Sequence, residues 1–311
     1  MKTTSKWITI FILLLSVGLA GCSGEDSNKK VIGISLQNFS DEFRTYIIDA
    51  MQEEQKKHPD IEFVYADAQN DSSTQKGDIE NFVARGVDAI IFTPVDTVAA
   101  MDIVHMVNEA DIPLIILNQT FDGADKAAAY VGSESIESGI LQMEEVAKLL
   151  NGKGNIAIMD GTLGHEAQIK RTEGNMQIIK EHPDMKVVKQ GSANWSRPEG
   201  MELMENWMQS SKIDAVVANN DEMAIGAIMA LESEGKLKDT VVAGIDATPA
   251  ALDMMQEGKL KVTVFQDAAG QGKASIETAV KAANGEEVED AIIPYQLVTP
   301  ENVDEFAAKY E

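Results

Sequence analysis

Short apolar runs alternate with amphipathic segments along most of the chain. The runs are four to six residues long and rich in β-branched side chains, which is typical of strands buried on both faces of a parallel sheet. Between them, apolar side chains recur at helical spacing, as at Phe43, Ile47 and Met51. We therefore predict strands over residues 31–36, 61–66, 88–92, 112–117, 155–159, 185–188, 214–218, 240–245 and 261–265.

The repetition of strand and helix predicts a doubly wound α/β architecture. The first four strand–helix units end near Val131, and a second series follows a helix predicted over residues 136–150. A chain of 311 residues is also near the size at which one hydrophobic core divides into two. The sequence thus predicts two lobes, each built on its own parallel sheet.

The N-terminal segment has the features of a secretory signal peptide. Lys2 and Lys6 precede an apolar run over residues 7–17, which is short for a membrane span, and small residues lead to Cys22. This ending resembles the bacterial lipobox, in which the cysteine is lipidated and becomes the first residue of the mature protein. We expect a signal peptide over residues 1–21, a lipid anchor at Cys22 and a polar tether over residues 22–30, with the protein held outside the cytoplasm on the cell membrane.

Charge and cysteine content exclude several classes of function. The chain has 51 acidic and 26 Lys and Arg residues, a formal charge of −25, so it would repel the phosphates of a nucleic acid. The single cysteine excludes an internal disulfide framework and a multi-cysteine metal site. Uncharged or cationic small ligands remain.

Amides and carboxylates follow nearly every predicted strand. Ligands of open α/β sheets bind beyond the carboxyl ends of the strands, so these side chains are expected to line a cleft. Each of them can instead cap the following helix, and the two roles can coexist because a cap uses one oxygen only. The residues concerned are Gln37, Asn38, Asp67, Thr93, Asn118, Gln119, Asp160, Asn219, Asn220, Asp221, Asp246, Gln266 and Asp267.

Such a lining suits a small neutral polyol, because every hydroxyl both donates and accepts a hydrogen bond. Sugars and cyclitols have this chemistry, and the apolar faces of sugar rings pack on aromatic side chains. Phe43, at the start of the first helix, and Trp195, in a polar loop, are placed to supply aromatic faces. Phe43 could equally belong to the core.

Catalytic motifs are absent from the sequence. No GxGxxG follows a strand, Gly270–Lys273 lacks the Ser or Thr of a phosphate-binding loop, and His165-Glu166 is followed by Ile169 where a zinc protease has its second histidine. We therefore expect a binding protein without catalytic residues, metal or cofactor. The rival hypothesis is a sugar-modifying enzyme that uses Asp41 and Asp246 as acid and base.

Three segments carry a family resemblance: residues 130–139 (YVGSESIESG), 216–227 (VVANNDEMAIGA) and 244–249 (GIDATP). On these residues the chain resembles the type I periplasmic sugar-binding proteins of ABC importers, and in particular their galactose/glucose-binding and ribose-binding members. Repressors of the lactose-repressor type share this core, but they begin with a DNA-binding helix-turn-helix where this chain has a signal peptide.

The resemblance implies nine sugar-binding residues. Three departures limit the transfer: Ala167 replaces an aspartate, Gln266 replaces an asparagine, and the short loop at residues 151–154 lacks the carboxylates of a calcium site. The implied residues are Asp41, Phe43 and Asn118 in the first lobe and His165, Arg171, Trp195, Asn220, Asp246 and Gln266 in the second lobe and hinge, with Phe43 and Trp195 on the two faces of the sugar ring.

The resemblance also implies a hinge of three crossings between the lobes. We place them near residues 131–132, 266–267 and 291–294, which gives lobe one residues 31–131 plus 267–291 and lobe two residues 132–266 plus 292–311. The implied protein is a monomer that closes on a hexose resembling glucose or galactose and presents it to an ABC permease. Ribose, myo-inositol and autoinducer-2 are alternative ligands, and a chemoreceptor or sensor kinase is an alternative partner.

Overall fold

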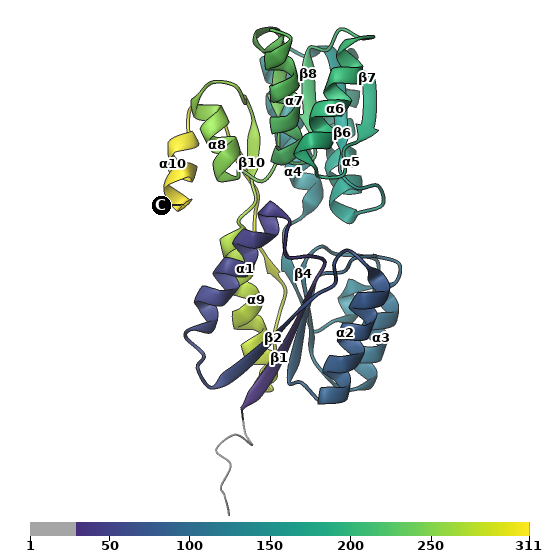
Figure 1. Cartoon of the computed structure of the whole chain (residues 1–311), viewed down its shortest axis with the longest axis vertical. Helices are drawn as coiled ribbons and strands as arrows, with labels where there is room; N and C mark the ends of the chain where they lie inside the picture. The colour runs from purple at the N-terminus through teal and green to yellow at the C-terminus, as the bar shows by residue number, and fades with distance from the viewer. Residues whose placement is uncertain (1–28, 311) are drawn as a thin grey trace, which may run out of the picture.

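A computed structural model describes residues 29–310. The predicted signal peptide, the anchor at Cys22 and most of the predicted tether lie outside these residues. Within them, parallel sheets and their covering helices form two lobes stacked end to end (Figure 1). This confirms the predicted fold class.

Lobe one is built on a six-stranded sheet in the order β11-β5-β4-β3-β1-β2, and every neighbouring pair is parallel. Helices α1 and α9 cover one face of this sheet and α2 and α3 the other (Figure 1). Its elements are β1 (Lys30–Leu36), α1 (Glu42–Gln55), β2 (Ile61–Asp67), α2 (Ser72–Arg85), β3 (Ala89–Phe92), α3 (Ala100–Glu109), β4 (Leu114–Asn118), β5 (Ala129–Gly132), α9 (Ala268–Ala283) and β11 (Ala291–Ile292).

Lobe two is built on a four-stranded parallel sheet in the order β7-β6-β8-β9, and an antiparallel pair of β10 and β12 lies beside it. Single bridges join this pair to the sheet, at Ala243–Val262 and Asp246–Phe265. The elements are α4 (Ser135–Leu149), β6 (Lys153–Asp160), α5 (Glu166–Glu181), β7 (Asp184–Ser192), α6 (Arg197–Met208), β8 (Ala215–Ala218), α7 (Asp221–Ser233), β9 (Val241–Ala243), α8 (Pro249–Gln256), β10 (Thr263–Phe265), β12 (Gln296–Val298) and α10 (Val303–Ala307).

Each sheet has a hydrophobic core on both faces, which explains the continuous apolar runs of its central strands. In lobe one, Ile34 and Ile91 pack beneath α1 and α9, while Ile90 and Phe92 pack beneath α2 and α3. Lobe two is likewise divided into two clusters on opposite faces of β6 and β8. Nine predicted strands appear with shifted ends, whereas the short strands β5, β11 and β12 were not predicted.

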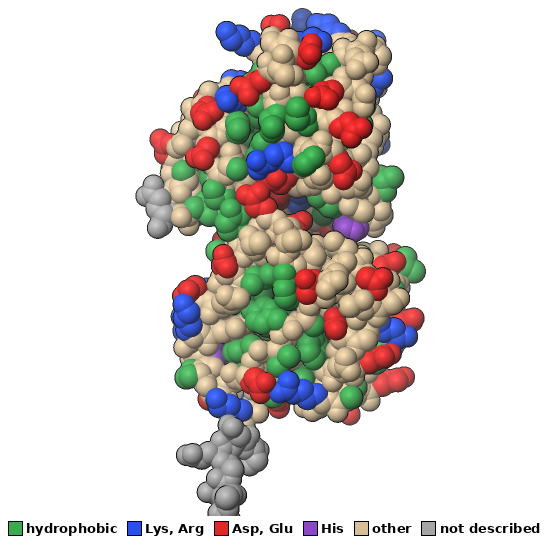
Figure 2. Space-filling view, viewed as in Figure 1, with side chains coloured by type: hydrophobic (Ala, Val, Ile, Leu, Met, Phe, Trp, Pro, Cys, Tyr) green, Lys and Arg blue, Asp and Glu red, His purple; other side chains and the backbone are tan. Residues whose placement is uncertain are grey.

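The chain passes between the two sheets three times. It leaves lobe one between β5 and α4, returns between β10 and α9, and leaves again between β11 and β12. We call residues 132–134, 266–267 and 293–295 the first, second and third crossings. In the space-filling view the lobes meet at a narrow waist, and acidic side chains are spread over both of them (Figure 2). The residue limits that we predicted for the two lobes stay a prediction.

Candidate functional site

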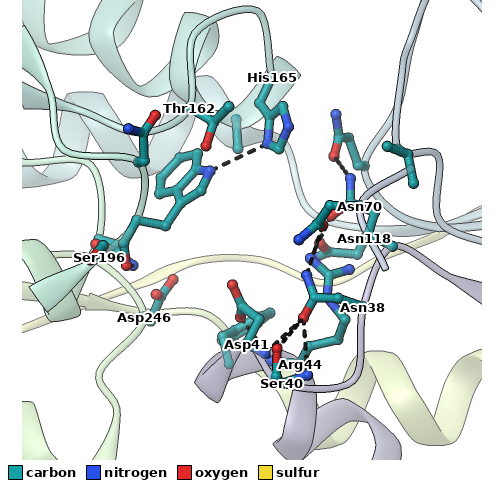
Figure 3. Close-up of a pocket in the computed structure, with 18 of the residues that line it drawn as sticks. Asn38, Ser40, Asp41, Arg44, Asn70, Asn118, Thr162, His165, Ser196 and Asp246 are labelled. Carbon is teal, nitrogen blue, oxygen red and sulfur yellow. Dashed lines mark hydrogen bonds between the residues drawn. The ribbon is translucent and has the colours of Figure 1, made fainter. Parts of the chain in front are cut away.

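A cavity of about 790 Å³ lies between the lobes, at the carboxyl ends of their strands. Lobe one contributes the segments that follow β1, β2, β3 and β4, and lobe two those that follow β6, β7, β8 and β9. The close-up shows side chains from both lobes directed toward this space (Figure 3). All nine residues predicted from the resemblance line it: Asp41, Phe43, Asn118, His165, Arg171, Trp195, Asn220, Asp246 and Gln266.

The loop before α1 is ordered by its own polar side chains. Asn38 Oδ1 accepts hydrogen bonds from the backbone N–H of Ser40 (3.0 Å) and of Asp41 (2.8 Å), while Asn38 Nδ2 donates to Asn70 Oδ1 (2.9 Å). Asp41 in turn caps α1, since its Oδ1 accepts from the backbone N–H of Arg44 at 3.2 Å. The cap uses one carboxylate oxygen, so the other remains available to a ligand hydroxyl.

A buried row of polar side chains forms the base of the cavity in lobe one. Arg44 Nη2 donates to Gln37 Oε1 at 2.5 Å, and Gln37 Nε2 donates to Gln119 Oε1 at 2.6 Å. Within residues 29–310, Arg44 Nε and Gln119 Nε2 have no hydrogen-bond partner although both are buried. Buried donors are normally paired, so both are suited to an oxygen atom of a ligand.

Arg44 is a cavity residue that the sequence analysis missed. It follows Phe43 and lies inside helix α1. The sequence analysis selected residues that follow predicted strands, so a residue within a helix was not considered. Gln119 was among the strand-end residues but not among the nine site residues. The sequence does show a cation in the first turn of the helix after the first strand, but not which side of that helix faces the cavity.

In lobe two, Arg171 of α5 organises the polar groups. Its Nη1 donates to the carbonyl of Asn219 (2.5 Å) and to Asp246 Oδ1 (3.4 Å), and its Nη2 donates to Gln266 Oε1 (2.8 Å). Burial raises the pKa of Asp246 well above its usual range, and the nearby Arg171 guanidinium opposes this shift. The pair places a donor and an acceptor side by side, which is what adjacent hydroxyls of a polyol require.

Trp195 and His165 form the aromatic wall of lobe two. Trp195 Nε1 donates to His165 Nδ1 at 3.3 Å, and the two rings lie 6.2 Å apart between centroids. Burial and the Arg44 cation lower the pKa of His165, so the ring is neutral at pH 7 and its Nε2 carries a proton that can be donated. Phe43 contacts the lobe-one core and also lines the cavity, and its packing on a face of the ligand ring stays a prediction.

Backbone strain gathers at the same place. Asn118, Trp195 and Asp246 have φ values of 67°, 65° and 123°, in the region that residues with a Cβ rarely adopt. Such strain costs on the order of 1–3 kcal/mol per residue and persists where the surrounding structure holds it. Its presence at three of the nine predicted site residues supports a functional site.

Several strand-end residues lie elsewhere and have structural roles. Asp160 accepts hydrogen bonds from Gln168, Thr172 and Gln190, and Asp221 accepts from the backbone of Thr248. The strand-end rule therefore selects more residues than the cavity uses. Those outside the cavity are Asp67, Thr93, Asp160, Asn219, Asp221 and Asp267.

Residues 29–310 contain no group of three His, Cys, Asp or Glu side chains arranged to hold a metal ion. In the same range, none of the helices combines the length and the hydropathy of a membrane span.

A cleft between two α/β lobes, lined by hydrogen-bonding groups from both, is typical of a solute-binding protein. Residues 32–287 match the family model of the periplasmic binding protein domain. The chain belongs to this family, which confirms the resemblance seen in the sequence. Membership implies a place outside the cytoplasm and a permease as partner, and it makes the chain a binding protein rather than an enzyme.

Three similar proteins show the range of the family. An ABC transporter solute-binding protein of Bacillus halodurans, solved with bound myo-inositol, is 68% identical with a TM-score of 0.90 over 92% of this chain and 100% of that chain. A protein of Rhizobium meliloti described as a candidate rhizopine-binding protein is 40% identical over 95% of this chain and 98% of its own. The ribose import binding protein of Bacillus subtilis is 31% identical over 94% and 99%.

Proposed function

We propose that this protein is the lipid-anchored receptor of an ABC importer and binds a cyclitol, myo-inositol first, between its two lobes. The observation that carries the proposal is the myo-inositol bound by the Bacillus halodurans protein, which is 68% identical to this chain along nearly its whole described length. The paired donors and acceptors of the cavity support it, because each hydroxyl of a polyol can use one of each.

The cavity chemistry also supports a ligand without net charge. Its lining includes four carboxylates, those of Asp41, Asp71, Asp96 and Asp246, and two guanidinium groups, those of Arg44 and Arg171. An anionic ligand would face the carboxylates and a cationic ligand the guanidinium groups across a partly desolvated space, which is costly. A neutral polyol can bind both signs at once.

The hexose expected from the resemblance gains no support from these three proteins, whose names or bound ligands are myo-inositol, rhizopine and ribose. Ala167 lines the cavity where the galactose/glucose-binding members have an aspartate, so one acceptor for a hexose hydroxyl is missing. A hexose therefore becomes the second choice of ligand, with ribose and autoinducer-2 after it.

The anchor belongs to the same proposal. Lipidation at Cys22 and the tether that follows would hold the receptor at the membrane beside its permease, and stable anchoring needs two or more acyl chains. A chemoreceptor or sensor kinase that recognises the same closed form would be a second partner. Metabolic labelling of the expressed full chain with a fatty-acid analogue tests the anchor, because Cys22→Ser should abolish the label.

Isothermal titration of the mature chain carrying Cys22→Ser tests the ligand. We expect saturable binding of myo-inositol with a dissociation constant in the micromolar range, about −8 kcal/mol, and binding of glucose, galactose, ribose and xylitol that is at least tenfold weaker. Tightest binding of a hexose would overturn the cyclitol assignment. No binding across the whole panel would overturn the proposal.

A further inference from the structure

Two buried side chains outside the cavity connect its polar groups to the crossings. Gln271, in the first turns of α9, and Tyr295, in the third crossing, do not line the cavity, yet each is hydrogen-bonded to a residue that does. Their exposed fractions are 0% and 6%. Neither residue follows a strand as an obvious cap, and the sequence analysis did not select either of them.

The link in lobe one runs from Asn118 through Gln271 to Ser133. Asn118 Nδ2 donates to Gln271 Oε1 at 2.9 Å, and Gln271 Nε2 donates to Ser133 Oγ at 3.1 Å. Ser133 belongs to the first crossing, and α9 begins directly after the second. Because its amide nitrogen is engaged by Gln271, Asn118 is oriented with Oδ1 as its remaining acceptor for a ligand.

The link in lobe two runs from Arg171 to the other two crossings. Its Nη2 donates both to Gln266 Oε1 (2.8 Å), in the second crossing, and to the hydroxyl of Tyr295 (3.4 Å), in the third. Gln266 is thereby oriented with Nε2 as its remaining donor. Arg171 also reaches Asp246, so one guanidinium contacts the ligand pocket and two of the three crossings.

We propose that Gln271 and Tyr295 are positioning residues that make the angle between the lobes depend on how the cavity residues are held. A hinge motion changes backbone dihedrals in the crossings and so moves Ser133, Gln266 and Tyr295 relative to their partners. A ligand held by Asn118 and Arg171 favours the lobe angle at which these hydrogen bonds align. The coupling is the same for every ligand, since neither positioning residue touches the ligand itself.

This inference rests on the proposed function only in that a polyol occupies the cavity. Positioning residues and contact residues can be distinguished by how their loss changes the affinities for several different ligands. Loss of a positioning hydrogen bond should weaken all ligands by one common factor, because the shared cost of closure rises. Loss of a contact residue should change the ratio between ligands, because each ligand presents different hydroxyls to it.

The test uses Tyr295→Phe and Gln271→Met in the mature chain. The matched controls are Tyr65→Phe, which removes a hydroxyl bonded to Gln55 in lobe one, and Ser275→Ala, which removes a buried hydroxyl one turn further along α9. Affinities for myo-inositol and scyllo-inositol are measured by titration, and small-angle scattering of each protein is recorded with and without myo-inositol. Thermal denaturation verifies that each variant is folded.

We expect both test variants to bind the two inositols 5- to 50-fold more weakly with their affinity ratio unchanged, and to differ from the parent in the scattering of the ligand-free form. The controls should match the parent in affinity and in scattering.

A changed ratio between the affinities for the two inositols, or parental affinity and scattering in both test variants, would overturn the inference. If the parent binds neither inositol, the proposed ligand fails, while the scattering of the ligand-free variants still decides the coupling. Should Gln271→Met unfold, Ser133→Ala breaks the same link and is read in the same way.

Discussion

Asn220 combines a structural and a binding role at one residue. Its Oδ1 accepts from the backbone N–H of Met223 at 3.0 Å and so caps α7, while the side chain lines the cavity. We expect Asn220→Ala to weaken myo-inositol binding by about 1–3 kcal/mol through the lost ligand contact. It should also lower the free energy of unfolding by about 1 kcal/mol through the lost cap.

Thr248→Ala is the matched control for Asn220→Ala, since Thr248 caps α8 away from the cavity. Titration and urea unfolding of both variants separate the two roles. The control should lose about 1 kcal/mol of stability and keep parental affinity. Normal binding by Asn220→Ala would remove Asn220 from the site.

Glu166 should make stability depend on pH. Ser135 Oγ donates to it at 2.9 Å, and burial raises its pKa from 4.5 to about 7. The folded chain thus holds this proton more tightly than the unfolded chain, so stability falls as pH rises from about 4.5 to 7. Glu166→Gln keeps the acceptor for Ser135 and removes the titration.

We expect Glu166→Gln to exceed the parent in unfolding free energy by about 1–3 kcal/mol at pH 8 and to equal it at pH 4. Urea unfolding at pH 4, 6 and 8 measures the difference. A difference that does not vary with pH would show that folding leaves the pKa of Glu166 unchanged.

Which side chains meet in the cavity was predictable mainly where the backbone fixes them. Asn118 ends β4, and Asn220 and Asp246 lie within three residues of the ends of β8 and β9; the geometry of a parallel sheet brings such ends together. Arg44 could not be found in this way, because its place in the cavity depends on which side of α1 faces lobe two. That orientation is set by packing between residues distant in sequence.

At the scale of elements, the short strands were not predictable from local pattern. β11 has two residues and β12 has three, too few to show a period of alternation or an apolar run. Their pairing with β5 and β10 depends on partners more than 30 residues away in the sequence. The longer central strands carried a clear signal because both of their faces are buried.

Glycines allow the close crossing of α4 and α5. A Cβ on Gly174 would lie 2.4 Å from the carbonyl oxygen of Ile136, and one on Gly139 would lie 2.0 Å from that of Arg171. We expect Gly174→Ala to cost about 1–3 kcal/mol of stability by forcing the helices apart. Myo-inositol affinity should also fall, because α5 carries Arg171 into the cavity.

Gly77→Ala on α2 is the control for Gly174→Ala, because its Cβ would meet nothing within 4 Å. It should leave binding unchanged and raise stability by about 0.5–1 kcal/mol, since alanine favours the helix. Thermal unfolding measures the stability of the two variants, and titration measures their affinity for myo-inositol. Parental affinity in a folded Gly174→Ala would mean that the helix spacing does not position Arg171.

At the scale of the whole molecule, the two-lobe organisation was predictable from repetition, but its discontinuity was not. Nothing local in α9 shows that it returns to lobe one and packs on α1, more than 200 residues earlier. The family resemblance supplied the three crossings.

The lobes also meet through a charged contact beside the cavity. Arg197 of α6 holds Glu222 with two hydrogen bonds of 2.9 and 2.7 Å, and its Nη2 lies 3.8 Å from Glu42 on α1. Among residues 29–310 this is the only ion pair that joins the lobes. Burial and Glu222 raise the pKa of Glu42 to about 7, while Arg197 opposes the shift.

Separation of the lobes would return Glu42 to water and away from Glu222, so its pKa would fall toward 4.5. Protonation therefore favours the lobe arrangement described here as the pH falls below about 7. Glu42 is partly exposed, so the ratio between the joined and the separated arrangement of the lobes should change only a few-fold.

We expect small-angle scattering of the ligand-free parent to give a larger radius of gyration at pH 8.5 than at pH 5.5. Glu42→Gln should abolish the difference and Glu62→Gln, whose partner Arg85 lies in the same lobe, should keep it. A radius independent of pH in the parent would mean that this contact does not control the lobe angle.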